Sequence, residues 1–271
     1  MSKTKIAVLG AGKMGETLIS SLLQAKVITK GQVVATTKHA ARSEMLAEKY
    51  DIDTTTENRQ AIDGADMVLL CVKPQVVPDV LEEIRAGLNA RHLVVSVAAS
   101  VTTRFIEQMI GKEVPVIRAM PNTPCLLRQG MTGVCAGAFA SEADLERAEF
   151  IFKQVGRTVI VDEKHMDAVT GLSASGPAFI YVVIESMAEG GVKVGLPRNV
   201  ATELAAQAVL GAASMVLETG EHPALLKDVV TTPAGCTIDG LMELEEGGLR
   251  VTLIKTVVTA TRRAAELMEK K

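Results

Sequence analysis

The stretch Lys5-Ile6-Ala7-Val8-Leu9-Gly10-Ala11-Gly12-Lys13-Met14-Gly15 decides the fold of this 271-residue chain. An apolar run, then glycines spaced G-x-G-x-x-G, then a helical pattern is typical of the strand–turn–helix unit that binds a dinucleotide. Gly10 permits the tight turn, Gly12 lets backbone N–H groups approach a pyrophosphate, and Gly15 lets the helix pack closely on the strand. The alternative is a glycine-rich turn without a ligand. A P-loop is disfavoured, because Lys13 is not followed by Ser or Thr.

The first 160 residues alternate short β-branched runs with helical patterns. The expected strands are Lys5–Leu9, Gln32–Thr37, Met67–Val72, Leu93–Val97 and Val114–Arg118, with Gly133–Cys135 and Thr158–Val161 as edge strands. The expected helices are Met14–Lys26, Ala40–Tyr50, Gln75–Gly87 and Thr103–Ile110. Runs that are apolar throughout indicate strands buried on both faces, as in a parallel sheet. The order predicts an α/β fold with an N-terminal Rossmann-like, doubly wound, mainly parallel sheet.

After about Asp162 the strand signals stop. Five helical patterns follow, namely Pro177–Val194, Pro197–Thr219, Pro223–Val230, Ile238–Glu246 and Leu249–Lys270. We therefore expect a dinucleotide-binding Rossmann-like domain over residues 1–163 and an all-helical C-terminal domain, for dimerisation and substrate binding, over residues 164–271. The segment Val200–Val216 has too many small and apolar residues for one solvated face, which favours its burial against a second subunit.

Composition excludes several partners. With 29 basic and 32 acidic side chains and only 3% aromatic residues, the chain offers neither a positive field nor stacking platforms for nucleic acid. The segment Met166–Val192 contains no Lys or Arg, but Asp167, Glu185 and Glu189 interrupt it. Because its continuous apolar centre is far shorter than the roughly 20 residues that a bilayer requires, we interpret it as a buried helix and expect no membrane span.

The cysteines and histidines suggest no metal site. The four cysteines are widely spaced without a C-x-x-C pair, and the four histidines show no metal-ligand spacing. Small buried cysteines of this kind are typical of a reduced, cytoplasmic protein, and the N-terminus shows no export signal. We therefore expect no metal and a cytoplasmic location.

The end of the second expected strand indicates which dinucleotide is bound. An NAD site would place Asp or Glu about 20 residues beyond the glycines, to bind the ribose 2′-OH. This chain has Thr36-Thr37-Lys38 there, with Arg42 one helical turn further on. Hydroxyls and cations suit a 2′-phosphate, so we predict that NADPH is preferred, with NADH as the alternative cofactor. The other interpretation is that Lys38 and Arg42 are ordinary surface cations.

Several motifs occur together in a characteristic order. They are VLGAGKMG at 8–15, VKPQ at 72–75, SVAAS at 96–100, RAMPNTP at 118–124, SGPAF at 175–179 and TTPAGCTIDGL at 231–241. In this combination the chain resembles pyrroline-5-carboxylate reductases over nearly its whole length. That resemblance implies an oxidoreductase that reduces 1-pyrroline-5-carboxylate to L-proline with NAD(P)H, the last step of proline biosynthesis. It also implies a homodimer with intertwined helical domains, which some members assemble into a ring of five dimers.

The resemblance also assigns cofactor contacts. The glycine turn Leu9, Gly10, Ala11, Gly12, Lys13 and Met14 would bind the phosphates, and Thr36, Thr37 and Lys38 the adenosine ribose or its phosphate. Asn58 is the expected contact after the third strand. The segments Cys71, Val72, Lys73, Pro74 and Val97, Ala98, Ala99 would line the nicotinamide half at the carboxyl edge of the sheet, with Asn122 nearby.

The substrate loop carries over to Thr231, Thr232, Pro233, Ala234, Gly235, Cys236 and Thr237. Thr237 matches the family's contact to the ring nitrogen and is our candidate catalytic residue; a helix N-cap ahead of Ile238 is a compatible alternative. Backbone N–H groups at that helix start would bind the substrate carboxylate. Ala234 replaces a family glycine, which adds a Cβ where the backbone needs freedom. Glu221 is a further candidate near the site.

Two other functions compete. An NADP-dependent hydroxy-acid dehydrogenase would typically place a Lys on the long helix after the sheet domain, and Met166–Val192 contains none. A non-catalytic dinucleotide-binding regulator has only Ala234 and Cys236 in its favour. The sequence therefore favours the reductase, whose partner is a small-molecule substrate.

Overall fold

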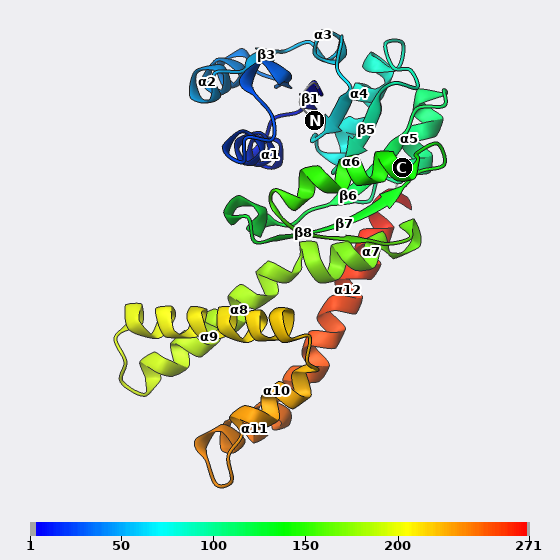
Figure 1. Cartoon of the computed structure of the whole chain (residues 1–271). Helices are drawn as coiled ribbons and strands as arrows, with labels where there is room; N and C mark the ends of the chain where they lie inside the picture. Colours follow the sequence, from blue (N-terminus) through cyan, green and yellow to red (C-terminus); the bar gives the residue numbers. More distant parts are fainter. Residues whose placement is uncertain (1–3, 270–271) are drawn as a thin grey trace. The chain divides into compact units, whose positions relative to one another are not determined.

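An eight-stranded sheet forms the centre of the N-terminal part of the chain (Figure 1). The computed structural model describes residues 4–269. The strand order is β3-β2-β1-β4-β5-β6-β7-β8, and all neighbours are parallel except β6 and β7. The strands are β1 Ile6–Leu9, β2 Val33–Thr36, β3 Asp53–Thr55, β4 Met67–Leu70, β5 Leu93–Ser96, β6 Val116–Met120, β7 Gly130–Ala136 and β8 Gly156–Ile160. The predicted doubly wound, mainly parallel sheet is confirmed.

Two layers of helices cover the two faces of the sheet. Because side chains alternate along a strand, Ile6 and Val8 of β1 face one core and Ala7 and Leu9 face the other. The first core includes α1 Lys13–Gln24, α2 Ala40–Tyr50 and α6 Glu142–Lys153, and the second includes α3 Asn58–Ile62, α4 Val77–Ile84 and α5 Thr103–Ile110. Short 3₁₀ turns lie at η1 Lys30–Gln32, η2 Pro74–Val76 and η3 Thr123–Leu127.

The structure contains elements that the sequence pattern did not predict. Strand β3 is only three residues long and polar, so it carries no apolar run. Helix α6 follows a capping box in which the Ser141 hydroxyl accepts a hydrogen bond from the Asp144 N–H, a signal that the sequence does contain. The expectation that Gly133–Cys135 is an edge strand is wrong, because it lies inside β7, which pairs with β6 and β8. Strand β8 does form the edge.

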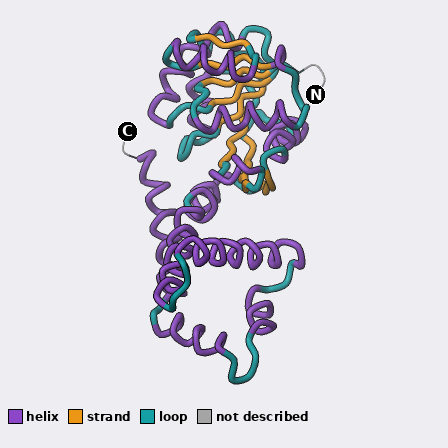
Figure 2. Tube along the Cα trace, turned by 90° about the vertical axis from the view of Figure 1, so that its left-hand side faces the viewer, coloured by secondary structure: helices purple, strands orange, loops and turns teal. Residues whose placement is uncertain are grey.

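The C-terminal part of the chain is helical within the described residues (Figure 2). After η4 Glu163–His165, α7 Met166–Val169 and the π-helical turn η5 Thr170–Ala174 come α8 Gly176–Lys193, α9 Arg198–Thr219, α10 Pro223–Val230, α11 Cys236–Glu246 and α12 Leu249–Glu269. Helices α8 and α9 pack through Ala188, Ala201 and Ala205, and a Cβ on Gly191 would lie 2.9 Å from the Ala201 Cβ. Most other apolar side chains of these helices are exposed in a single chain.

The chain divides into two compact units that do not coincide with the expected domains. The first unit comprises Met1–Ser175 and Ala260–Lys271, and the second comprises Gly176–Thr259. The last turns of α12 belong to the first unit because they pack there: a Cβ on Gly171 would lie 2.6 Å from the Thr261 backbone nitrogen, and the Ser100 hydroxyl donates to the Ala264 carbonyl at 2.8 Å. The first unit is therefore discontinuous in sequence, whereas we expected a single boundary between residues 163 and 164.

Two helical segments are long and apolar enough to cross a membrane by length and composition alone. They are Glu163–Lys193 and Arg198–Thr219, and few of their residues are buried in a single chain. This is a weak indication, since a helix that a second subunit covers has the same composition. The absence of a membrane span stays a prediction.

Candidate active site

The glycine turn has the geometry that a pyrophosphate requires. Gly10 has φ +81°, and a Cβ there would lie 2.4 Å from Val72 Cγ1, so no other residue fits without a shift. A Cβ on Gly15 would lie 3.1 Å from the Gly10 carbonyl oxygen, which explains the close approach of α1 to the turn. Beside Gly12 the nearest atom would be 4.0 Å away, so the N-terminus of α1 is open to an anion.

The hydroxyls that we expect to bind the ribose, those of Thr36 and Thr37, are buried and form hydrogen bonds within the protein. The backbone N–H of Gly10 donates to the Thr36 hydroxyl at 3.1 Å, and that hydroxyl donates to Asn58 Oδ1 at 2.7 Å. The Asn58 amide in turn donates to Glu83 Oε2 at 2.7 Å. Thr37 donates to the His39 carbonyl at 3.0 Å. Thr36 and Asn58 therefore join the glycine turn to the second and third strand ends.

The two expected phosphate-binding cations differ in their surroundings. Lys38 is exposed and forms no hydrogen bond or ion pair within the described residues. Arg42 is half-buried and pairs with Glu16 of α1, and its Nη2 also reaches the Ala11 carbonyl at 3.5 Å. Lys38 is thus the cation best placed to meet a 2′-phosphate, whereas Arg42 is tied to the flank of the glycine turn.

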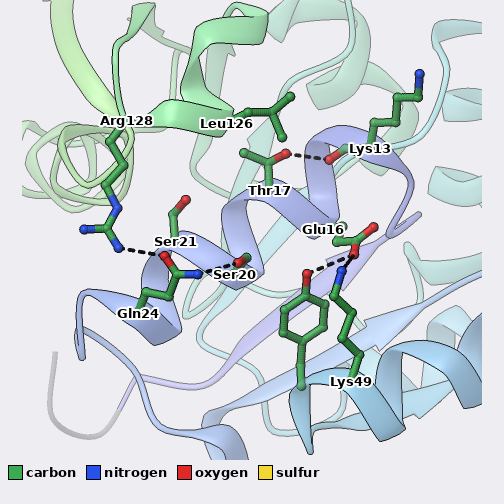
Figure 3. A pocket seen from close by; sticks show the side chains of 10 residues that line it. Lys13, Glu16, Thr17, Ser20, Ser21, Gln24, Lys49, Leu126 and Arg128 are labelled. Carbon is green, nitrogen blue, oxygen red and sulfur yellow. Dashed lines mark hydrogen bonds and ion pairs between the residues drawn. The ribbon is translucent and has the colours of Figure 1, made fainter.

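A polar cleft of about 300 Å³ runs along α1 (Figure 3). Glu16 lies in it and accepts hydrogen bonds from Lys49 and from the Tyr50 hydroxyl, both at 2.9 Å. Burial alone would raise the pKa of Glu16, but the hydrogen bonds from Lys49, Arg42 and Tyr50 outweigh it and lower that pKa from 4.5 to about 2. This cluster was missed, because no sequence spacing relates Glu16 to residues 33 or 34 positions away.

The segments that we expect to line the nicotinamide follow adjacent strands at the carboxyl edge of the sheet. Strands β1, β4 and β5 are adjacent and parallel, so the residues that follow them lie at one edge. The Cys71 N–H donates to the Leu9 carbonyl at 2.8 Å, and the Val97 N–H donates to the Leu70 carbonyl at 3.0 Å. Lys73 precedes the turn that Pro74 begins. Burial raises the pKa of the Cys71 thiol to about 12, which disfavours the thiolate form.

Asn122 follows the neighbouring strand β6, and both ends of its amide are engaged. Its Nδ2 donates to the Ser173 carbonyl at 3.2 Å, and its Oδ1 accepts from the Met131 N–H at 2.9 Å. The side chain therefore ties strand β7 to the π-helical turn η5. In this structure Asn122 has a framework role, and its expected contact with the nicotinamide stays a prediction.

The expected substrate loop connects α10 to α11 in the helical unit. Ala234 has φ +56°, so the chain adopts a left-handed conformation with an alanine where the family has glycine. Gly235 is the N-cap of α11, which makes the expectation of Thr237 as an N-cap wrong. Thr237 instead lies in the first turn. It is half-buried, and no hydrogen bond of its hydroxyl occurs within residues 4–269. The N-terminus of α11 is thus preceded by a tight turn.

Within the described chain, no group of three or more His, Cys, Asp or Glu side chains could hold a metal ion. The glycine turn fits a dinucleotide, through open backbone N–H groups at the start of α1 and the exposed cation Lys38 beyond β2.

Comparisons with known proteins agree with this geometry. The pyrroline-5-carboxylate reductase dimerisation family matches residues 163–267, and the coenzyme F420-dependent NADP oxidoreductase family matches residues 5–100. A pyrroline-5-carboxylate reductase of Methanosarcina acetivorans is 42% identical over 270 residues, which cover 100% of both chains. The solved pyrroline-5-carboxylate reductase of Coxiella burnetii has a TM-score of 0.92 at 36% identity and covers 98% of this chain and 99% of its own. That of Plasmodium falciparum, with NADP bound, has a TM-score of 0.88 at 28% identity, with 98% of each chain covered.

Proposed function

The chain belongs to the pyrroline-5-carboxylate reductase family, and we propose that it reduces 1-pyrroline-5-carboxylate to L-proline with NAD(P)H, the last step of proline biosynthesis. One observation carries the proposal: relatives with this activity in their names match the chain from end to end, through both the glycine turn and the loop before α11. The protein is an oxidoreductase that acts on a C=N bond.

The residues of the first unit hold the cofactor. The open N-terminus of α1 binds the pyrophosphate, and the strand ends at Cys71–Pro74 and Val97–Ala99 flank the nicotinamide. NAD(P)H supplies a hydride to the ring carbon of the imine when it is bound. Exposed Lys38 provides the charge that favours the 2′-phosphate, so we propose NADPH as the preferred form.

The loop Thr231–Thr237 binds the substrate. Backbone N–H groups in the first turn of α11 bind its carboxylate, because a helix N-terminus is favourable for an anion. The Thr237 hydroxyl donates to the ring nitrogen of the neutral imine and so orients the neighbouring C=N carbon for hydride attack. An imine is more basic than a ketone and takes up a proton easily, so the site does not need a strong acid. Ala234 keeps the left-handed conformation, so the alanine does not abolish the turn.

The helical region forms a homodimer. The dimerisation family covers residues 163–267, and the exposed apolar side chains of α8 and α9, such as Tyr181, Val182 and Leu204, supply the surface. We further propose that the protein acts in the cytoplasm, without membrane or nucleic-acid partners, and that a ring of dimers is its larger assembly. Light scattering measures the mass, and a monomer would contradict the dimer.

The test is the oxidation of NADPH, followed by its absorbance, with 1-pyrroline-5-carboxylate as substrate. NADH and a 2-keto acid serve as parallel controls. Rapid turnover that requires the imine is expected, and it should be faster with NADPH than with NADH. Turnover of the keto acid alone would replace the reductase with a hydroxy-acid dehydrogenase. Binding of NADPH without any turnover would point to a regulator.

A further inference from the structure

The loop that follows β5 ends in a strained, buried serine. Ser100 has φ +64°, a left-handed conformation that is strained for a residue with a Cβ. Its side chain is almost completely buried at 4% exposure. A serine held in this conformation requires compensation from its surroundings. The compensation comes from a residue far along the chain.

The Ser100 hydroxyl donates to the backbone carbonyl of Ala264, at 2.8 Å and 164 residues away in sequence. Ala264 is 3% exposed and lies in the last turns of α12, which belong to the same compact unit as Ser100. The C-terminal turns of α12 are thus hydrogen-bonded to the carboxyl edge of the sheet.

The loop Val97–Ser100 also borders a pocket. A mostly apolar pocket of about 260 Å³ lies beside it, and the pocket lining includes Pro74, Ala99, Ser100, Phe105 and Leu267. Fewer packed atoms oppose a shift of the loop on the side that faces this pocket. The loop could therefore move toward the pocket if the hydrogen bond of Ser100 were lost. The hydrogen bond to Ala264 therefore limits where Val97–Ala99 can lie.

We propose that Ser100 is a positioning residue, which holds Val97–Ala99 against the nicotinamide half of the cofactor through its hydrogen bond to the Ala264 carbonyl. The inference rests on the proposed function, since that function places the nicotinamide beside Val97–Ala99. The adenosine half lies elsewhere, at the ends of β1 and β2, and does not depend on this loop.

The test compares two ligands in the full-length protein. NADPH contains both halves of the cofactor, whereas 2′,5′-ADP contains only the adenosine half and its phosphates. The variants are Ser100→Ala, which removes the hydroxyl, and Ser100→Gly, which removes it and also relieves the φ +64° strain. Ser100→Gly keeps the test valid where Ser100→Ala fails to fold. Thr158→Val is the matched control, because it removes a hydroxyl that hydrogen-bonds to Glu149 at 2.7 Å, on the edge strand β8.

Loss of one hydrogen bond should weaken NADPH about fivefold in both Ser100 variants and leave the affinity for 2′,5′-ADP unchanged. The control should leave both affinities unchanged. Equal weakening of the two ligands, no weakening of NADPH in Ser100→Gly, or a similar effect of the control would overturn the proposal. Binding is measured without turnover, so a wild-type protein that binds NADPH but does not reduce the imine refutes the proposed function and leaves this comparison readable.

Discussion

The Thr36 hydroxyl accepts a hydrogen bond from the Gly10 N–H at 3.1 Å, so the residue expected to read the ribose also fixes the glycine turn. Thr36→Val keeps the shape of the side chain but leaves this N–H without its partner. A lost buried hydrogen bond costs about 1–3 kcal/mol, so we expect NADPH and NADH to weaken alike, by about tenfold. Fluorescence titration with each cofactor measures this, and weakening of NADPH alone would contradict the framework role.

In contrast to Thr36→Val, Lys38→Ala should weaken the binding of NADPH but not that of NADH. Lys38 is exposed and supports no other group within the described residues, so its removal changes the charge and little else. We expect the KM for NADPH to rise about tenfold or more, with the KM for NADH unchanged. Lys26→Ala, at another exposed lysine, is the control. An equal loss with both cofactors would show that Lys38 does not contact the 2′-phosphate.

Ala234→Gly should stabilise the protein. Ala234 has φ +56°, where glycine avoids a Cβ penalty of about 1–2 kcal/mol but loses roughly 0.5–1 kcal/mol to the entropy of the unfolded chain. The free energy of unfolding should therefore rise by about 0.5–1 kcal/mol, which denaturant titration detects. Ala265→Gly, inside helix α12, should lower it by about 1 kcal/mol. A loss of stability in Ala234→Gly would mean that the methyl group makes compensating contacts.

The ionised carboxylate of Glu16 should make a pH-dependent contribution to the free energy of unfolding. Its folded pKa is lowered from 4.5 to about 2, so the stabilisation is fully present above the unfolded value and is lost as the pH falls from about 4.5 to about 2. Glu16→Gln should lower Tm at neutral pH, and the difference from the wild type should shrink across that window. Thermal unfolding at several pH values measures it. A difference independent of pH would assign the effect to packing.

Thr237→Ala tests the substrate contact. Its hydroxyl lies in the first turn of α11 and has no partner within the described chain, so its removal should affect the imine more than the fold. We expect kcat/KM for 1-pyrroline-5-carboxylate to fall at least tenfold, with KM for NADPH unchanged. Thr237→Ser keeps the hydroxyl and should recover most of the activity. Full activity in Thr237→Ala would remove Thr237 from the mechanism.

The apolar runs and the glycine spacing predicted most of the fold, because burial on both faces leaves a strong signal. Strand β3 escaped prediction, since an edge strand of three polar residues has no such signal. The return of Ala260–Lys271 to the sheet unit was also unpredictable from sequence, because a helical pattern does not reveal what its last turns contact.

The candidate site could be predicted in part. The positions of the glycine turn and of the segments after β4 and β5 could be predicted, because the carboxyl ends of adjacent parallel strands lie at the same edge of a sheet. The pairing of Arg42 with Glu16, and the hydrogen bond between Thr36 and Asn58, join side chains from four elements, which no linear spacing records. The N-cap of α11 is Gly235 and not Thr237. Both glycine and threonine are common at N-caps, so the sequence alone does not show at which of them the helix begins.

The discontinuous first unit also constrains how the protein is made. Its second segment, Ala260–Lys271, is synthesised only after the whole helical insertion, whereas the sheet is complete about 100 residues earlier. The nascent sheet unit must therefore wait, with Ser100 and Gly171 uncovered, until synthesis of the helical insertion ends. A chain that stops before residue 260 should therefore leave Ser100 and Gly171 exposed, even though it contains all eight strands of the sheet.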